Sequence, residues 1–317
     1  MTRVALLDDY QGVAMNLAPW ANLGAAVEVV PFHDHLDDEA ALIERLASFD
    51  VIMAMRERTP FPRSLFAALP NLKLLVTAGM RNASIDMQAA ADHGVTVCGT
   101  GGLPTPTAEL AWGLILSLMR FIPREDAATR AGSWETTVGL TLHGKRLGVV
   151  GLGRLGAQVA KVGVAFGMDV VAWSQNLTAE RAAEIGVRRV DKEELLQSSD
   201  VISVHLVLSE RSRGLIGAAE LALMKSTAFI VNTSRGPIID ETALVGALRD
   251  GTIAGAGLDT FDVEPLPTDH PLLKLDNTVI TPHLGYVTDE SLRVFYEETL
   301  EDIQGFLAGS PVRVLST

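Results

Sequence analysis

The sequence has little cysteine and no long hydrophobic run, and both absences limit the class of protein. Cys98 is the single cysteine, so no disulfide can form within the chain, and we expect a cytoplasmic location. No uncharged apolar run approaches the roughly 20 residues of a membrane span, and the run from Leu110 to Met119 is typical of a buried helix. The apolar run at the N-terminus is interrupted by Asp8 and Asp9, which makes it too short for the core of a signal peptide.

Positive charge is also scarce. The chain has 26 Lys and Arg against 39 Asp and Glu, and its net charge of −13 repels nucleic acids and anionic membranes, so we expect neither as a partner. An anionic substrate is repelled at long range for the same reason, so its site must supply its own Arg, Lys or backbone N–H groups. With 317 residues, of which 48% are hydrophobic, the chain is typical of a globular protein of two domains.

Short apolar runs alternate with helical patterns in the first third of the chain. This alternation predicts a parallel sheet with helices on both faces. The expected strands are 3–7, 27–31, 51–55, 73–77 and 95–98, and the expected helices include 38–47, 62–68 and 85–92. A segment rich in Gly and Pro, 99–106, predicts a linker, and a long helix follows with Thr105 or Thr107 as its cap and an apolar run up to Ile122.

A second alternating series begins at Lys145 and predicts a doubly wound α/β arrangement. Its expected strands are 146–150, 169–173, 201–205, 228–232, 255–259 and 278–281. A strong helical pattern at 291–307 comes after this second sheet is complete. The economical interpretation is that this last helix returns to the first domain.

A glycine-rich turn follows the first strand of the second series. Gly151, Gly153 and Gly156 form the pattern G-x-G-x-x-G, with Arg154 and Leu155 inside it, and an apolar helix follows. The first glycine allows the tight turn, the second lets a pyrophosphate approach the backbone, and the third lets helix and strand pack closely. Free N–H groups at the helix N-terminus favour phosphate, so the pattern predicts a dinucleotide site. The alternative is a glycine-rich turn selected for packing alone.

The second strand of this series ends without the acid that holds the ribose 2′-hydroxyl of NAD in many such domains. Ser174, Gln175 and Asn176 follow it instead, and none of them repels a 2′-phosphate. No Arg follows Ser174 directly. We therefore expect NADP or NAD as the cofactor, with a preference for NADP.

The expected fold is α/β with two doubly wound domains. A Rossmann NAD(P)-binding domain at 99–284 is inserted into a flavodoxin-like substrate domain made of 1–98 plus 285–317.

Three loops after strands of the second series carry residues suited to the reduction of a 2-oxo acid, and ligands of parallel sheets bind at these strand ends. Arg235 is a permanently charged, planar donor for the substrate carboxylate and carbonyl. His283 can supply the proton that the carbonyl oxygen gains. Glu264 can orient that histidine and favour its protonated form, and Asp262 is the competing candidate for this role.

In order and spacing, these motifs closely resemble the D-isomer-specific 2-hydroxyacid dehydrogenase family, which includes glyoxylate/hydroxypyruvate reductases and phosphoglycerate dehydrogenases. A weaker resemblance covers the first domain. The matching segments of the second domain are 151–156, Asn232-Thr233-Ser234-Arg235-Gly236, Asp259 with Glu264-Pro265, and Thr281-Pro282-His283-Leu284-Gly285.

The resemblance implies a division of roles in the second domain. Arg235, Glu264 and His283 would form the catalytic set, and Asp259 would touch the nicotinamide carboxamide. The other expected cofactor-binding residues are Thr107, His205, Thr233 and Gly285, together with the glycine-rich turn and Ser174, Gln175 and Asn176.

The resemblance also implies a substrate loop and a partner. Ala78, Gly79 and Met80 would offer backbone N–H groups to the substrate carboxylate. We expect Arg56 or Arg81, which also follow strands of the first domain, to bind a second anionic or polar group of the substrate. The family is homodimeric, so we expect a homodimer with the helix near 110–121 and the following arm at its interface.

Three positions depart from the family pattern and bear on the substrate. His205-Leu206-Val207 lacks the proline that the family carries after its histidine, Arg81 is less usual for the substrate loop, and Tyr286 replaces a small residue.

The predicted function is therefore hydride transfer between NAD(P)H and a small 2-oxo acid or D-2-hydroxy acid, as in a glyoxylate/hydroxypyruvate reductase. One alternative is a D-3-phosphoglycerate dehydrogenase, which a phosphate-binding role for Arg81 would favour. The other is a non-catalytic dinucleotide-sensing protein. Because the sequence ends soon after Leu307, we expect no added regulatory domain. The substrate, direction and pathway stay open.

We expect no metal site. His33 and His35 lie among acids and could bind a metal, but a solvated acidic loop is the favoured interpretation. Cys98 is expected to be a small buried residue and not a nucleophile.

Overall fold

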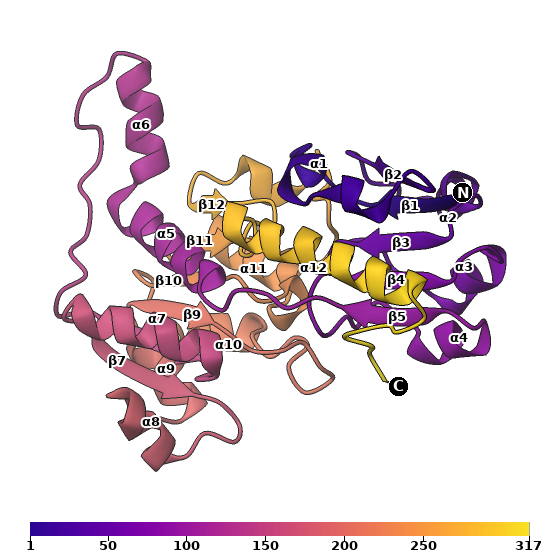
Figure 1. Cartoon of the computed structure of the whole chain (residues 1–317). Helices are drawn as coiled ribbons and strands as arrows, with labels where there is room; N and C mark the ends of the chain where they lie inside the picture. The colour runs from indigo at the N-terminus through magenta and orange to yellow at the C-terminus, as the bar shows by residue number, and fades with distance from the viewer. Residues whose placement is uncertain (317) are drawn as a thin grey trace. The chain divides into compact units, whose positions relative to one another are not determined.

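The structure is a computed structural model that describes residues 1–316 and separates them into two units (Figure 1). The first unit joins Met1–Leu103 to the segment that begins at Thr288, and the second is Pro104–Val287. These boundaries lie a few residues beyond the predicted ones.

The first unit contains a five-stranded parallel sheet in the order β2-β1-β3-β4-β5, which is the flavodoxin-like order. Its strands β3 and β4 are buried at every residue, which explains their nearly continuous apolar sequences. The strands of the sheet are β1 (Thr2–Leu6), β2 (Val27–Pro31), β3 (Val51–Ala54), β4 (Leu74–Thr77) and β5 (Thr96–Gly99).

Helices cover both faces of this sheet. Apolar residues of α2 (Glu39–Leu46), α3 (Arg63–Ala68) and α4 (Met87–Asp92) form one core with the strands. On α2 and α4, the N-cap side chains Asp38 and Asp86 accept hydrogen bonds from backbone N–H groups three residues later, which fixes where each helix begins.

The last helix, α12 (Asp289–Leu307), packs on β4 and belongs to the first unit, as its position after the second sheet predicted. It also contacts α1 (Ala14–Leu17) and the short 3-10 helix η1 (Trp20–Leu23), where the rings of Trp20 and Tyr296 meet edge to face at 6.3 Å.

The second unit contains a seven-stranded parallel sheet in the order β12-β11-β10-β9-β6-β7-β8. This is the Rossmann order with one strand added at the β11 edge. Its strands are β6 (Arg146–Val150), β7 (Asp169–Trp173), β8 (Arg188–Arg189), β9 (Val201–Val204), β10 (Phe229–Asn232), β11 (Gly255–Leu258) and β12 (Thr278–Ile280). The predicted fold class is thus confirmed.

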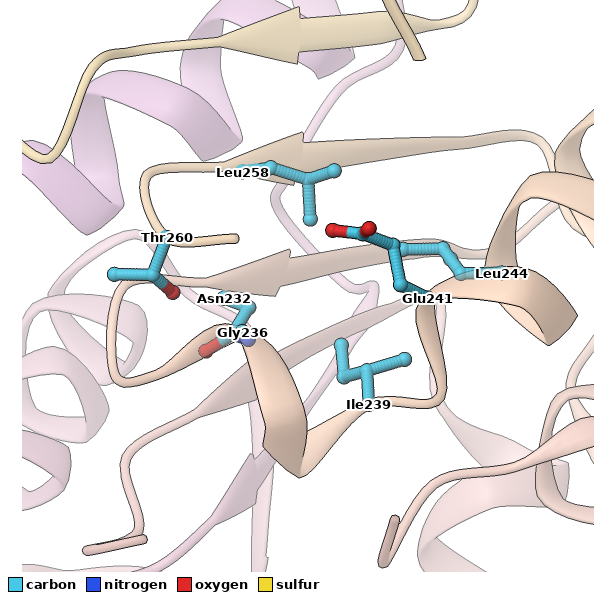
Figure 2. A pocket seen from close by; sticks show the side chains of 7 residues that line it. All are labelled: Asn232, Gly236, Ile239, Glu241, Leu244, Leu258 and Thr260. Atoms are coloured by element: carbon cyan, nitrogen blue, oxygen red, sulfur yellow. The ribbon is translucent and has the colours of Figure 1, made fainter. Parts of the chain in front are cut away.

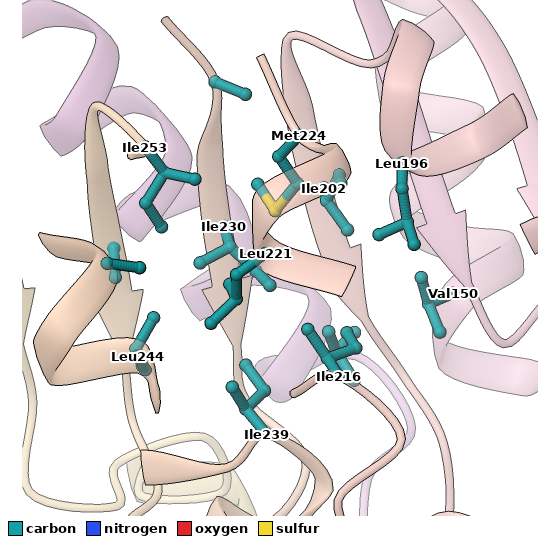
Figure 3. Packing of buried hydrophobic residues seen from close by; sticks show 14 of the residues in the cluster. Val150, Leu196, Ile202, Ile216, Leu221, Met224, Ile230, Ile239, Leu244 and Ile253 are labelled. Carbon is teal, nitrogen blue, oxygen red and sulfur yellow. The ribbon is translucent and has the colours of Figure 1, made fainter. Parts of the chain in front are cut away.

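Two apolar cores hold this second sheet. One lies against α5 (Pro106–Arg120), α7 (Arg154–Ala165) and α8 (Ala179–Ile185). The other, shown in Figure 3, packs strand residues such as Ile202 and Ile230 against Leu196, Leu221 and Leu244. Those three leucines come from α9 (Lys192–Ser198), α10 (Ala218–Leu223) and α11 (Glu241–Arg249), respectively.

The long helix α5 begins at the predicted cap and ends two residues before Ile122. Thr105 occupies the N-cap position, but its side chain makes no capping bond. The apolar run up to Ile122 is broken at Phe121, whose left-handed φ of 52° ends α5 and lets α6 (Ile122–Arg130) begin in a new direction. Figure 1 shows α6 and the segment after it projecting from the sheet of their unit. No helix among the described residues is long and apolar enough to cross a membrane.

Candidate active site

The glycine-rich turn between β6 and α7 has the geometry of a pyrophosphate site. Gly151 has a φ of +99°, and a Cβ there would lie 2.6 Å from the His205 carbonyl oxygen. A Cβ on Gly156 would lie 2.0 Å from the Gly151 carbonyl oxygen, so helix and strand approach too closely for any side chain. Gly153 has no atom within 4 Å of its Cβ position, which leaves open space at the N-terminus of α7.

Two buried polar atoms at the carboxyl ends of β9 and β10 also indicate a polar ligand. His205 Nδ1 and Thr233 Oγ1 have no hydrogen-bond partner within the described chain. The other ring nitrogen of His205 contacts the Ser203 hydroxyl at 2.8 Å, and burial lowers the pKa of His205 to about 4, so the ring is neutral at physiological pH. Together with the glycine-rich turn, these residues fit a dinucleotide.

The remaining predicted cofactor residues lie along the same sheet. Arg154 is exposed and Leu155 half-buried in the first turn of α7. Ser174 is half-buried at the end of β7, and Gln175 and Asn176 are exposed beside it.

His283 follows β12 and is paired with Glu264. Its Nδ1 lies 2.6 Å from Glu264 Oε2, and the other carboxylate oxygen accepts the Phe261 N–H at 2.9 Å. His283 itself has a left-handed φ of 54°. Because Nδ1 faces the carboxylate, Nε2 is the ring nitrogen that can exchange a proton with a substrate. Of the two competing acids, Glu264 is the one in contact with the histidine.

The surroundings of Glu264 keep it ionised. Burial acts to raise the pKa of Glu264, but the hydrogen bond and charge of His283, the Phe261 N–H and the charge of Arg235 outweigh it. The net result is a pKa below the ordinary value. Arg235 is therefore close enough to the pair to act on it electrostatically.

Arg235 is presented by a turn that Asn232 organises. The Asn232 side chain donates to the Arg235 carbonyl oxygen at 2.9 Å and accepts the Ser234 N–H at 3.0 Å. The Ser234 hydroxyl then donates to the Val204 carbonyl oxygen at 2.8 Å, which ties the turn to β9. The sequence reasoning gave Asn232 no role, although Asn at the start of a turn is a known signal.

Asp259, fully buried after β11, fixes the loop that carries His283. Its carboxylate accepts hydrogen bonds from the Thr281 hydroxyl at 2.6 Å and from the backbone N–H groups of Leu284 and Gly285 at 2.7 and 2.8 Å. The Thr107 hydroxyl donates to the Gly285 carbonyl oxygen at 2.9 Å. Burial raises the pKa of Asp259 despite these bonds. The contact of Asp259 with the nicotinamide carboxamide stays a prediction. The hydrogen bonds that Thr281 and Leu284 donate to Asp259 were not predicted from the sequence.

In the first unit, the predicted substrate residues meet at the carboxyl ends of β3 and β4. The Arg56 guanidinium donates to the Ala78 carbonyl oxygen at 3.2 Å, and it occupies the space where a Cβ on Gly79 would lie. The Gly79 N–H donates to the Thr100 hydroxyl at 2.9 Å. Met80 is half exposed and Arg81 is exposed.

The histidines near the N-terminus pair with acids. His35 contacts Asp8 through Nδ1 at 2.8 Å and Asp37 through Nε2 at 3.1 Å. Within residues 1–316 no group of three or more His, Cys, Asp and Glu side chains is arranged to hold a metal ion. Cys98 is buried, and burial raises the pKa of its thiol to about 12.

A small cavity lies behind the turn of Arg235 (Figure 2). Its volume of about 10 Å³ is at the lower limit for one water molecule, so it cannot hold a substrate. The Glu241 carboxylate is engaged by His270 Nε2 at 3.1 Å and by the Asp262 N–H at 3.2 Å. The lining residues are Asn232, Gly236, Ile239, Glu241, Leu244, Leu258 and Thr260.

Comparison with known proteins agrees with this geometry. Residues 112–285 match the model of the D-isomer specific 2-hydroxyacid dehydrogenase NAD binding domain. The glyoxylate reductase of Korarchaeum cryptofilum is 36% identical over 84% of this chain and 82% of its own. The D-3-phosphoglycerate dehydrogenase of Archaeoglobus fulgidus is 40% identical over 86% of this chain but only 52% of its own, so the chain spans about half of that relative.

A solved structure extends the likeness to nearly the whole chain. The phosphoglycerate oxidoreductase of Vibrio cholerae superposes with a TM-score of 0.93 at 36% identity, covering 98% of this chain and 100% of that one. The fold and site thus define a protein with a nicotinamide dinucleotide-binding domain. The chain belongs to the D-isomer specific 2-hydroxyacid dehydrogenase family, as its motifs predicted.

Proposed function

We propose that this protein reduces a small 2-oxo acid to a D-2-hydroxy acid, as a glyoxylate or hydroxypyruvate reductase does. The observation that carries the proposal is the 2.6 Å contact of His283 with Glu264 at the carboxyl edge of the dinucleotide-binding sheet. A histidine held by an ionised carboxylate, with an arginine nearby, is the set of groups that carbonyl reduction requires.

Each residue of the set has a distinct role. When bound, the reduced nicotinamide supplies the hydride. Arg235 binds the substrate carboxylate and polarises the carbonyl, and His283 donates a proton from Nε2 to the carbonyl oxygen. Glu264 orients the ring and stabilises its positive charge. In the direction of oxidation, His283 takes the proton from the hydroxyl group.

We further propose that NADP(H) is preferred over NAD(H). The support is the turn after β7, where Ser174, Gln175 and Asn176 replace the acid that would repel a 2′-phosphate. In this proposal Thr107, His205, Thr233, Asp259 and Gly285 contact the cofactor together with the glycine-rich turn.

A second candidate function is that of a D-3-phosphoglycerate dehydrogenase. It is favoured by two arginines at the carboxyl ends of β3 and β4, of which Arg56 lies on the Ala78 carbonyl and Arg81 is exposed. Either of them could bind a substrate phosphate. If Arg81 binds the phosphate, Arg81→Ala would raise KM for phosphohydroxypyruvate selectively. An unchanged KM for every oxo acid would remove Arg81 from that role.

We also propose that the protein is a cytoplasmic homodimer. The support for the homodimer is a set of apolar side chains on α6 and the segment after it: Ile122 is 50%, Trp134 78% and Val138 90% exposed. Burial of such residues against a second copy would remove them from water.

The proposal predicts oxidation of NADPH, and more slowly of NADH, in the presence of one or more 2-oxo acids. The panel is glyoxylate, hydroxypyruvate, pyruvate, 2-oxoglutarate and phosphohydroxypyruvate. We expect His283→Ala to lower kcat by about 10²–10⁴-fold, because general acid catalysis contributes about that much.

The matched control is His93→Ala, which removes an exposed histidine at the end of α4 and should leave the rate unchanged. If no oxo acid is turned over while the cofactor binds tightly, the catalytic proposal fails in favour of a dinucleotide-sensing protein. If kcat/KM with NADH equals or exceeds that with NADPH, only the proposed preference for NADP(H) fails, and the catalytic proposal stands.

A further inference from the structure

The edge strand β8 brings an arginine to the turn that follows β7. Arg189 is paired in register with Ala172, two residues before Ser174. Its Nε donates to the Leu177 carbonyl oxygen at 2.9 Å, and the Leu177 N–H donates to the Ser174 carbonyl oxygen at 3.1 Å. The guanidinium is therefore held against the same turn that lacks the NAD-specific acid. Because 15 residues separate it from Ser174 in sequence, the motif pattern did not reveal it.

The charge of Arg189 is not neutralised by a close ion pair. Its Nη2 lies 3.8 Å from Asp191, a carboxylate that is 84% exposed, and Arg189 itself is 41% exposed. Arg188 differs, because its guanidinium contacts Glu194 of α9 at 2.9 Å. Successive residues of a strand point to opposite faces, so the two neighbouring arginines face different surroundings.

We propose that Arg189 binds the 2′-phosphate of NADP(H). This assignment rests on the proposed NADP(H) preference and deepens it by naming the cation. The planar guanidinium has Nη groups available beyond the Nε that holds the turn, and such groups bind phosphate oxygens through charge-assisted bonds. A chain of net charge −13 needs a local cation of this kind to attract a dianion.

The test is equilibrium binding of 2′,5′-ADP and 5′-AMP, two probes that differ only in the 2′-phosphate, measured by calorimetry. We expect Arg189→Ala to weaken 2′,5′-ADP binding by about 10–100-fold, as for loss of a charged hydrogen bond. Binding of 5′-AMP should change less than about twofold. Arg188→Ala is the matched control and should behave as wild type.

Arg189→Gln addresses damage to the turn, because its amide can still donate to the Leu177 carbonyl oxygen while the charge is lost. It should show the same selective loss, and the ratio of the KM for NADPH to the KM for NADH should rise in parallel with the binding data.

The outcomes separate the two proposals. Equal wild-type affinity for both probes would overturn the NADP(H) preference and Arg189 with it. Wild-type preference for 2′,5′-ADP that survives in both Arg189 variants would overturn the assignment of Arg189 alone. An equal loss of both probes in Arg189→Gln would also overturn it, because the residue would then act only by shaping the turn.

Discussion

Asp302 is a buried carboxyl group with a hydrogen-bond partner, in the described part of the chain, for only one of its two oxygens. It is fully buried on α12; Arg313 donates to Oδ1 at 3.0 Å, and Oδ2 has no partner among residues 1–316. Burial raises the pKa of Asp302 to about 7; the charge of Arg313 acts against this, while Glu298 and Glu301 add to it. The raised value makes this one residue a source of pH-dependent stability.

The sign follows from proton linkage. Above the ordinary carboxyl pKa, the folded protein holds the Asp302 proton more tightly than the unfolded chain, so stability decreases as the pH rises toward 7. We expect Asp302 to account for a loss of up to about 2 kcal/mol between pH 5.5 and 7, since one pH unit is worth about 1.4 kcal/mol.

The measurement is the free energy of unfolding across this range for wild type and Asp302→Asn. The variant should give the flatter profile, while Asp289→Asn, which changes an exposed acid of the same helix, should follow wild type. Parallel profiles for Asp302→Asn and wild type would contradict the prediction.

At the residue scale, the catalytic side chains are easier to predict from the sequence than the side chains that position them. His283, Glu264 and Arg235 stand in recognisable motifs, and the contact of His283 with Glu264 agrees with the favoured pairing. Asn232 and Thr281 act through bonds to backbone groups or to a carboxylate brought close by folding. The local turn bonds of Asn232 follow a known sequence signal, but no local pattern encodes the contact of Thr281 with Asp259, 22 residues away, so that positioning role could not be predicted.

Among the elements, the junction of β6 and α7 is the one most sensitive to added volume. A Cβ on Gly156 would meet the Gly151 carbonyl oxygen at 2.0 Å and Val149 Cγ1 at 3.1 Å. We expect Gly156→Ala to push the helix from the strand, lowering stability by about 1–3 kcal/mol and weakening cofactor binding more than tenfold.

Two other glycines serve as comparisons, because neither has an atom within 4 Å of its Cβ position. Gly153→Ala should weaken cofactor binding with little loss of stability, and Gly246→Ala, inside α11, should leave binding unchanged. Thermal unfolding and cofactor titration of the three variants distinguish these effects. Unchanged stability in Gly156→Ala would show that the helix can move without cost.

The strands with apolar sequences were predicted from the sequence, and the polar strand β8 was not. The strand β8 consists of Arg188 and Arg189, which give no hydrophobic signal, and it exists because it pairs with Val171 and Ala172 of β7. The helix α6 was not predicted for a related reason, since it has no buried residue and gives no apolar pattern.

At the scale of the whole molecule, the protein should form a dimer if the apolar residues of α6 and the segment after it are buried by a second copy. Light scattering should then give twice the chain mass of 33.9 kDa for wild type. Replacing both Trp134 and Val138 by Glu should shift the protein to monomers, because two charges at a buried interface are costly. Leu273→Glu, at a 50% exposed position of the second unit, is the control. A monomeric wild type would refute the proposal.

The return of α12 to the first unit has a consequence for synthesis on the ribosome. The strands of that unit emerge first, but its core is complete only when the helix beginning at Asp289 follows. At about 5–20 residues per second, translation of the intervening second unit takes on the order of ten to forty seconds. The later-made unit can therefore finish folding first, while the nascent first unit keeps the apolar surface of β4 uncovered and available to chaperones.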